Sequence, residues 1–361
     1  MTARLRASTG IAEVVAAPRQ KQPRLALPRP EDVVRFPADM PPRLLVIVDA
    51  EEEFDWNHFV RSATAVTNVR HQVLAHEILD RWKVAPTYTV DYAVASQADG
   101  VAPLAELLAD GRCEIGAQLH SWVTPPFEET VSVQTSYACN LPRSLEFAKI
   151  ERLTETIADS FGVRPTIYRA GRYGLGPNSM DALLRFGYQI DCSILPWVNL
   201  NTRGGPDFSE FGVDPFWVDP RRSLLELPVS VGMTGMLDWM GVAEFLYPYL
   251  SSPSARSLHI PGILSRLRLL DRIPISPEGT SLEEAKLVTR WMLGQGHRVF
   301  AVSYHSSSLG IGVGPYVQNK ADLSAFLGWL DGYLEFFFSE IGGQPARPGE
   351  IRSLAQAATS G

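Results

Sequence analysis

Five carboxylates stand within seven residues near the start of the chain, directly after an apolar run. They are Asp49, Glu51, Glu52, Glu53 and Asp55. On an extended chain the odd-numbered carboxylates project to the same side. Like charges at this density repel one another, so the cluster either faces water or holds a cation. We expect a site, because side chains at the C-terminal end of a barrel strand converge on one mouth.

Polar groups that a hydrophobic core would not tolerate follow further apolar stretches of the chain. They are Gln118, His120 and Trp122, then Arg169, Arg172 and Tyr173, then Asp191 to Trp197, and finally His305 in the segment YHSSS. Acids, imidazoles, an arginine and aromatic rings gathered at one edge are hard to obtain from packing alone. They predict one active site where the loops after the strands open.

The elements that must position these groups alternate along the chain. Residues 44–48 are aliphatic without helical periodicity, which is typical of a strand buried on both faces. Further strands are expected at 86–94, 113–119, 166–169, 188–195, 224–231 and 299–305, and helices at 69–82, 104–109, 145–161, 179–186, 281–293 and 322–340. This alternation predicts an α/β fold with parallel strands, either a barrel related to the TIM type or an open sheet.

Composition suggests one large domain with peripheral segments. Residues 1–42 are rich in proline and predict an extended leader, and residues 43–340 form a single barrel domain. Within it, residues 233–272 are expected to be a helical insertion packed beside the barrel. Residues 341–361 are rich in Gly, Pro and Ala and predict a loose C-terminal tail.

Charge and hydropathy exclude several classes of partner. A net charge of -7 and a pI near 5.6 give no electrostatic footprint for nucleic acid. No apolar window is long enough to predict a membrane span, and the N-terminus lacks a secretory signal, so a cytoplasmic location is expected. Cys113, Cys139 and Cys192 are irregularly spaced and predict free thiols. The sequence does not indicate an oligomeric state.

Four segments together carry a resemblance to a known family. EIGAQLHSW (114–122), YRAGRYG (168–174), DCSILPW (191–197) and SYHSS (303–307) follow the acidic strand in order. The pattern resembles the NodB-homology polysaccharide deacetylases, carbohydrate esterase family four, and within them the WalW-like branch. The resemblance covers residues 44–338. It implies a deformed (β/α) barrel of about seven parallel strands, a divalent metal, usually zinc, and a carbohydrate substrate that loses acetyl groups.

The resemblance assigns roles to individual residues. Asp49 matches the general base, Arg169 the arginine that holds this acid ionised, and His305 the general acid. Tyr173 matches the residue whose backbone N–H binds the developing oxyanion, and Asp191 with Trp197 matches the motif that lines the acetyl pocket and orients the histidine. Trp122, Trp197 and Arg172 are expected to bind substrate, because aromatic faces at barrel mouths stack on sugar rings.

The metal ligands depart from the family pattern. The second acid of the opening motif falls at Ala50, and the two family histidines fall at Gln118 and Trp122. The nearest alternative set is Glu51, His120 and Gln118, although an amide is a poor replacement for imidazole on zinc. His120 is equally compatible with a buried histidine that is hydrogen-bonded to backbone.

Three functions are compatible with this pattern. The first is deacetylation of an amino sugar or glycan by metal-activated water, with Asp49 as base and His305 as acid. The second is metal-independent hydrolysis of another C–N bond, which the absent histidines favour. The third is a catalytically inactive barrel that binds a glycan through aromatic side chains.

Overall fold

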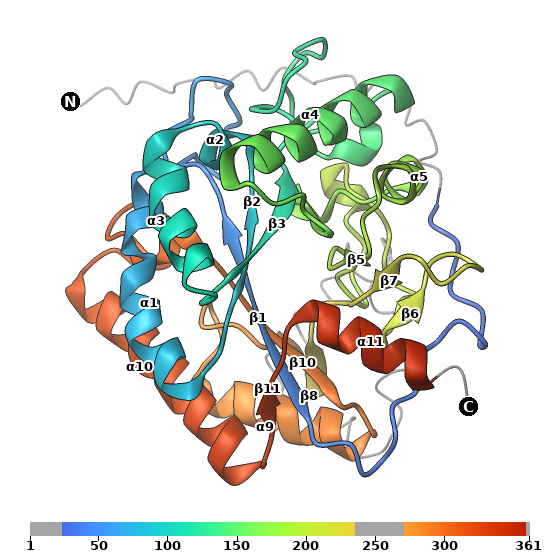
Figure 1. The fold of residues 1–361 in the computed structure, drawn as a ribbon, viewed down its shortest axis with the longest axis vertical. Helices are drawn as coiled ribbons and strands as arrows, with labels where there is room; N and C mark the ends of the chain where they lie inside the picture. The colour runs from blue at the N-terminus through green and yellow to red at the C-terminus, as the bar shows by residue number, and fades with distance from the viewer. Residues whose placement is uncertain (1–23, 235–270, 359–361) are drawn as a thin grey trace, which may run out of the picture.

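The computed structural model describes residues 24–234 and 271–358, and a curled sheet lies at its centre (Figure 1). The strands follow the order β10, β1, β2, β3, β4, β5, β7, β6, and all pairs from β10 to β7 are parallel. Their bounds are β1 (Arg43–Ala50), β2 (Thr87–Val90), β3 (Glu114–Leu119), β4 (Ile167–Ala170), β5 (Ile190–Asp191), β6 (Phe216–Trp217), β7 (Leu225–Glu226) and β10 (Val299–His305). The seven strands from β10 to β7 are parallel and curl into a half-barrel. This confirms the predicted fold class.

The first strand shows how the sequence builds both faces of the sheet. Leu44, Val46 and Val48 pack into the main core beneath the helices. The alternate residues Leu45 and Ile47 face a second apolar cluster. Asp49 continues this second face at the end of the strand. The acid therefore stands above an apolar floor, at the end of the barrel where the loops open.

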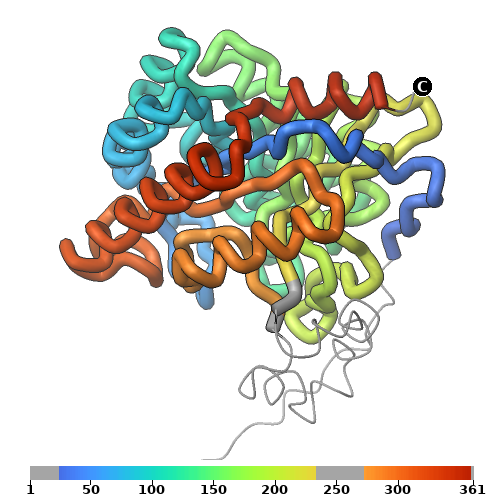
Figure 2. Tube along the Cα trace, turned by 90° about the horizontal axis from the view of Figure 1, so that it is seen from below, coloured from blue at the N-terminus to red at the C-terminus, as the bar shows by residue number. Residues whose placement is uncertain are grey.

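Helices surround the sheet (Figures 1 and 2). They are α1 (Gln72–Leu79), α3 (Ala98–Ala109), α4 (Arg143–Phe161), α5 (Pro177–Phe186), α9 (Leu282–Gly294) and α10 (Lys320–Glu335). α9 begins with a capping box between Ser281 and Glu284. α4 ends at Gly162, which has a left-handed φ of 69° that glycine adopts without strain.

Three predicted strands are shorter than expected, and the one predicted at 224–231 is reduced to β7. The strand predicted at 86–94 ends at Val90, because the Asp91 carboxylate accepts a hydrogen bond from the Val94 N–H at 2.7 Å and caps the short helix α2 (Tyr92–Ala95). The strand predicted at 188–195 is reduced to β5. The chain beyond it bends through Trp197, which has a left-handed φ of 60°.

The prediction of a loose tail at 341–361 is wrong for the residues that the structure describes. Gln344–Pro345 forms strand β11, which pairs with β1, and Pro348–Ala358 forms helix α11. Ile351 and Ala355 are fully buried in the apolar cluster that also contains Leu45 and Ile47. Ile351 and Ala355 are four residues apart and therefore lie on one face of α11. This face packs against the barrel and closes its floor, although the segment is rich in Gly, Pro and Ala.

The other peripheral segments are described only in part. Val34 is 2% exposed, and Val33 forms an isolated bridge to Phe216, so residues before β1 lie along the edge of the sheet. Most of the predicted 233–272 insertion lies outside the described residues. Its two ends form the antiparallel pair β8 (Val231–Thr234) and β9 (Asp271–Pro274).

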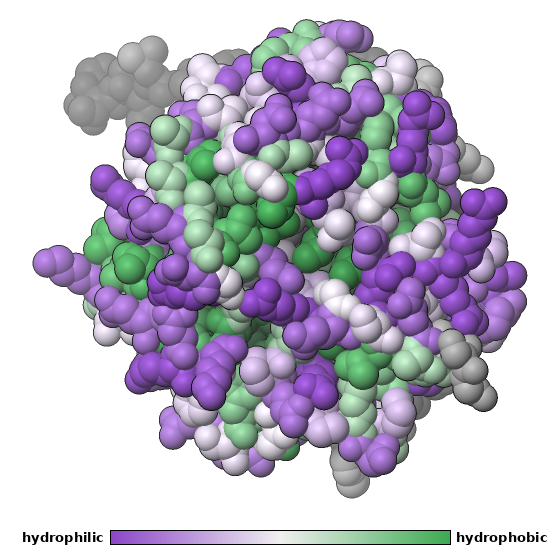
Figure 3. Space-filling model, viewed as in Figure 1, coloured by the Kyte–Doolittle hydropathy of each residue, from purple (hydrophilic) through white to green (hydrophobic). Residues whose placement is uncertain are grey.

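The surface of the described chain is mixed in polarity. Hydrophilic side chains cover much of the face seen in Figure 3, with hydrophobic ones between them. Among the helices that the structure describes, none combines the length and apolar character that a membrane crossing requires. The three cysteines are free, as predicted.

Ile351→Ala tests whether α11 closes the barrel floor. Ile351 is fully buried, so truncation should lower the free energy of unfolding by about 2–5 kcal/mol, measured by urea denaturation. Ser353→Ala on the exposed side of α11 is the matched control and should change it by less than about 0.5 kcal/mol. Equal effects of both substitutions would show that α11 contributes nothing specific to the core.

Candidate active site

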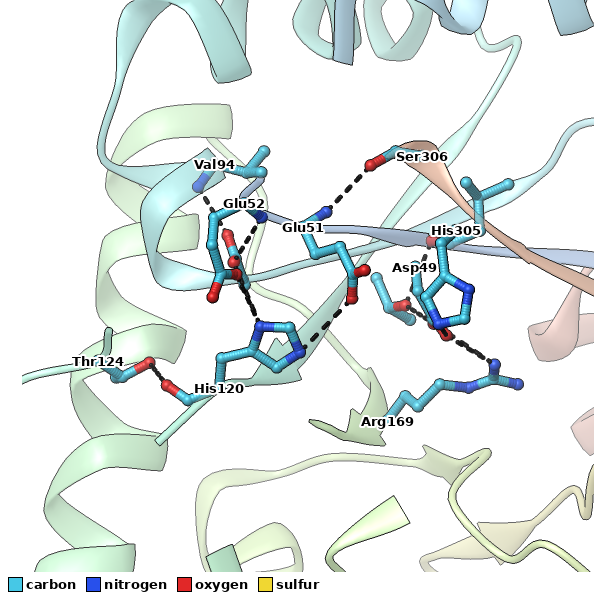
Figure 4. A network of polar contacts seen from close by, with 12 residues as sticks. Asp49, Glu51, Glu52, Val94, His120, Thr124, Arg169, His305 and Ser306 are labelled. Atoms are coloured by element: carbon cyan, nitrogen blue, oxygen red, sulfur yellow. Dashed lines mark hydrogen bonds and ion pairs between the residues drawn. The ribbon is translucent and has the colours of Figure 1, made fainter. Parts of the chain in front are cut away.

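Asp49 lies at the centre of the polar cluster (Figure 4). Parallel pairing of β1 with β10 sets Asp49 directly beside His305, whose Nε2 is 3.8 Å from Asp49 Oδ2. Arg169 Nη1 lies 3.2 and 3.4 Å from the two Asp49 oxygens, and the Thr89 hydroxyl donates to Oδ1 at 2.9 Å. Because Asp49 is only 4% exposed, the guanidinium supplies the charge compensation that burial demands.

Glu278 holds His305 from the other side. Glu278 Oε2 is 2.7 Å from His305 Nδ1, and Oε1 accepts the His305 backbone N–H at 2.8 Å. Burial disfavours the imidazolium, but Glu278 and Glu51 outweigh this effect and raise the pKa of His305 to about 10. The imidazole therefore carries a proton at neutral pH, with its Nε2 directed at Asp49.

The predicted role of Asp191 in orienting His305 is wrong. Asp191 is fully buried and accepts a hydrogen bond from Ser193, which in turn accepts the Ala170 N–H. Glu226 lies beside Asp191 and accepts the Ile194 N–H at 2.9 Å. Burial raises the pKa of Asp191 to about 6 and raises that of Glu226 as well. Asp191 thus braces the ends of β4 and β5.

His120 lies between two glutamates (Figure 4). Its Nδ1 is 2.7 Å from Glu52 Oε2, and its Nε2 is 3.5 Å from Glu51 Oε2. Glu51, His120 and Gln118 all line the cavity beside Asp49. Glu51 Oε1 and Gln118 Oε1 are buried without a hydrogen-bond partner in the described part of the chain.

Two of these donors, His120 and Glu51, have a spacing that suits a divalent metal. The 3.5 Å between His120 Nε2 and Glu51 Oε2 is close to the separation of about 3.3 Å that two ligands have in a tetrahedral zinc site. Glu52 occupies the outer position that commonly fixes the ring orientation of a metal-binding histidine. Burial raises the pKa of Glu51 to about 7, and a cation at this place would compensate the buried carboxylate.

A second possible donor set is less suited to a metal. Ligand atoms of Glu52, Asp91 and His120 lie within 4.8 Å of one another. The Asp91 carboxylate, however, already accepts the backbone N–H groups of Glu52 and Val94. Neither Glu52 nor Asp91 lines the cavity, so these two acids support His120 from behind.

Two aromatic residues that were predicted to bind substrate do not face the cavity. Trp122 is 1% exposed and stacks on the His120 ring at 4.3 Å. Trp197 is 5% exposed and belongs to the main core. Trp56 and Tyr316 line the cavity instead, and the Trp56 ring lies 4.6 Å from that of His305.

Arg172 and Tyr173 line the cavity, and the roles expected of them stay predictions. Both have a left-handed backbone, with φ of 55° and 58°. Such a conformation costs about 1–3 kcal/mol for each non-glycine residue and is concentrated at functional sites. The cavity measures about 460 Å³, within the range of small-molecule sites of about 300–1,000 Å³.

Several site residues were missed by the sequence analysis. Glu278 lies in the loop after β9, where no strand or motif marks it. Asp91 was hidden inside a segment predicted as a strand, although an aspartate before Tyr-Ala-Val-Ala could have been recognised as a helix cap. Glu52 was noticed only as part of the acidic run.

The class that the structure defines is one of fold: a NodB-like (β/α) barrel with ionisable side chains at the mouth formed by the strand ends. No protein-family model and no curated protein matches the sequence. Among solved structures, a Mycobacterium smegmatis protein provisionally titled polysaccharide deacetylase aligns with a TM-score of 0.53 and 17% identity, over 92% of this chain and 96% of that one. Puue allantoinase aligns with a TM-score of 0.50 and 13% identity, over 92% and 98%. At these identities the likeness is one of fold.

Glu278→Gln tests the pairing with His305. Removal of the carboxylate should lower the pKa of His305 from about 10 toward its usual value of about 6.5. At pH 8 the imidazole should then be charged in the parent protein and mainly neutral in the variant, as read by NMR of labelled histidine. Glu283→Gln, an exposed change on α9, is the control. An unchanged titration in Glu278→Gln would contradict the assignment.

Gln118→His tests the metal set. An imidazole beside His120 and Glu51 should raise zinc affinity at least about tenfold, because it replaces a weak amide donor. Competition with a chromophoric chelator measures this affinity. Gln189→His, at an exposed position outside the cavity, should leave zinc affinity unchanged. Equal affinities in the parent and Gln118→His would show that residue 118 is not a ligand of a cation at this place.

Proposed function

We propose that this protein is a hydrolase of carbon–nitrogen bonds that removes an acyl group, such as acetyl, from an amino sugar or glycan. The observation that carries the proposal is the pairing of Asp49 with His305 across one cavity. Asp49 is held by Arg169, and His305 is held by Glu278. An acceptor and a donor of protons thus stand side by side at one cavity.

Each member of this pair has one step in the reaction. Asp49 accepts a proton from the attacking water, and Arg169 and Thr89 keep the carboxylate oriented toward the cavity. His305 donates its Nε2 proton to the leaving nitrogen as the C–N bond breaks. Glu278 stabilises the imidazolium before this transfer. The nitrogen therefore departs as a neutral amine and not as an amide anion, which makes it a better leaving group.

The developing oxyanion needs donors of its own. The Tyr173 backbone N–H is the candidate, because the left-handed turn at Arg172 and Tyr173 directs this segment into the cavity. A divalent cation held by Glu51, His120 and Gln118 would add Lewis-acid polarisation of the acyl carbonyl.

A metal-independent hydrolase of another C–N bond is the second candidate. Two observations favour it: the metal-ligand candidates include one imidazole, His120, beside the neutral amide of Gln118, and Arg169 and the His305 imidazolium already supply positive charge in the cavity. The fold shared with an allantoinase is compatible with such chemistry. The two candidates differ in their response to chelation.

Asp49→Asn and His305→Ala should each reduce kcat on an N-acetylated amino-sugar panel by at least about 100-fold, as expected for loss of a general base or acid. Amine release measures the rate, and circular dichroism verifies folding. Glu283→Gln serves as the exposed control, and its kcat should match the parent. Unchanged turnover in both active-site variants would rule out the proposed roles.

Chelation separates the two candidates. Loss of amine release after dialysis against a chelator, with recovery on addition of zinc, supports the metal-assisted reaction. Full activity in the metal-free protein supports the second candidate. An inactive parent protein that binds glycans saturably would contradict both.

A further inference from the structure

The cavity is lined by several arginine side chains, which we call the arginine wall. Arg172, Arg203 and Arg272 line it in addition to Arg169. The acids that line the same cavity are Asp49, Glu51 and Glu278. Asp49 is paired with Arg169, and Glu278 with His305. Two of the three acids are thus already paired with cations, and the third, Glu51, lies beside His120, so Arg172 and Arg203 remain without an acidic partner in the described part of the chain.

Arg172 is fixed in place without an acidic partner. Its guanidinium lies between the rings of Phe59 and Tyr137, at 4.4 and 4.1 Å from their centroids, and donates to Ser136 and to the Val133 carbonyl. Burial lowers the pKa of Arg172, Tyr137 opposes this effect, and the charge of Arg203 adds to it. Two stacked rings and a left-handed backbone position the charge without neutralising it.

Arg203 adds a second cation on the same wall. It is exposed at the end of a short 3-10 turn (Asn201–Arg203) that packs beside Tyr137 through Gly205. Within residues 24–234 and 271–358, neither Arg172 nor Arg203 forms an ion pair with a carboxylate. Two guanidinium groups that face one cavity repel each other, and this arrangement costs energy that a bound anion would recover.

Resting on the proposed function, we infer that the substrate is anionic. It carries a carboxylate or phosphate group near the acylated nitrogen, and Arg172 and Arg203 bind this group while the acyl carbon faces both Asp49 and His305. A guanidinium recognises both anions through paired N–H donors. The chain would therefore select acidic or phosphorylated amino sugars over neutral chitin-like ones.

The experiment compares three ligands on the full chain: N-acetylglucosamine, its 1-phosphate, and a carboxymethyl ether of the same sugar. Calorimetry measures binding, and amine release measures turnover. The parent should bind one of the anionic sugars at least about tenfold more tightly than the neutral one, since a charge-assisted hydrogen bond contributes a factor of this size. The anionic sugar that binds more tightly shows whether the natural substrate carries a phosphate or a carboxylate.

Arg203→Gln and Arg172→Gln should each reduce this preference about tenfold, while Arg172→Lys retains part of it. Arg185→Gln, an exposed change on α5 outside the cavity, is the matched control and should preserve the preference. A purely structural role for Arg172 would lower affinity for all three sugars equally and leave the ratio unchanged.

The outcomes distinguish this inference from the proposed function. Amine release with no preference among the three ligands overturns the inference and leaves the hydrolase proposal intact. Arginine-dependent binding of an anionic sugar without amine release supports the inference and contradicts the hydrolase. Equal binding of all ligands, or a preference that survives both arginine-to-glutamine changes, shows that the cationic wall does not select substrate.

Discussion

The buried ion pair between Asp49 and Arg169 is the interaction on which the site depends. Both side chains are at most 5% exposed, and two charges removed from water to this degree must be compensated by each other and by hydrogen bonds. Thr89 and Ser303 supply these bonds from β2 and β10. The pair therefore ties together strands that are not neighbours in the sheet, β1 and β4. These two charges can stay buried in the cavity because each has the other as a fixed partner.

The rest of the cavity divides into regions of different chemistry. Glu51 lies between the Asp49–His305 pair and the His120 group, and both imidazoles lower its pKa against the larger effect of burial. Arg172, Arg203 and Arg272 line the same cavity. A shared fold does not decide which of these regions acts on a substrate. The barrel provides strand ends that converge, and the identity of the side chains at those ends determines the reaction.

Much of the site could be predicted because parallel strands carry their terminal residues to one edge. Asp49 and His305 end two strongly apolar runs, so their proximity followed from the fold class alone, and Arg169 followed from a motif. Glu278 could not be found in this way, because the loop that carries it has no periodic signal. The prediction that Trp122 faces the cavity was wrong, because the sequence does not reveal which aromatic side chains turn into the core. The Trp122 ring packs on the His120 ring and supports it. The α11 helix was missed because the prediction for this segment used its overall composition, in which the two buried positions, Ile351 and Ala355, do not stand out.

The closure of the floor by α11 has a consequence for biosynthesis. Leu45 and Ile47 emerge from the ribosome early, but Ile351 and Ala355, which cover the same cluster, are made only after nearly the whole barrel. β1 is likewise made long before β10, the strand with which it forms its most extensive pairing. Contacts so distant in sequence slow folding and leave apolar strand faces exposed in the nascent chain. Chaperone binding during translation would protect these faces until the last helix is complete.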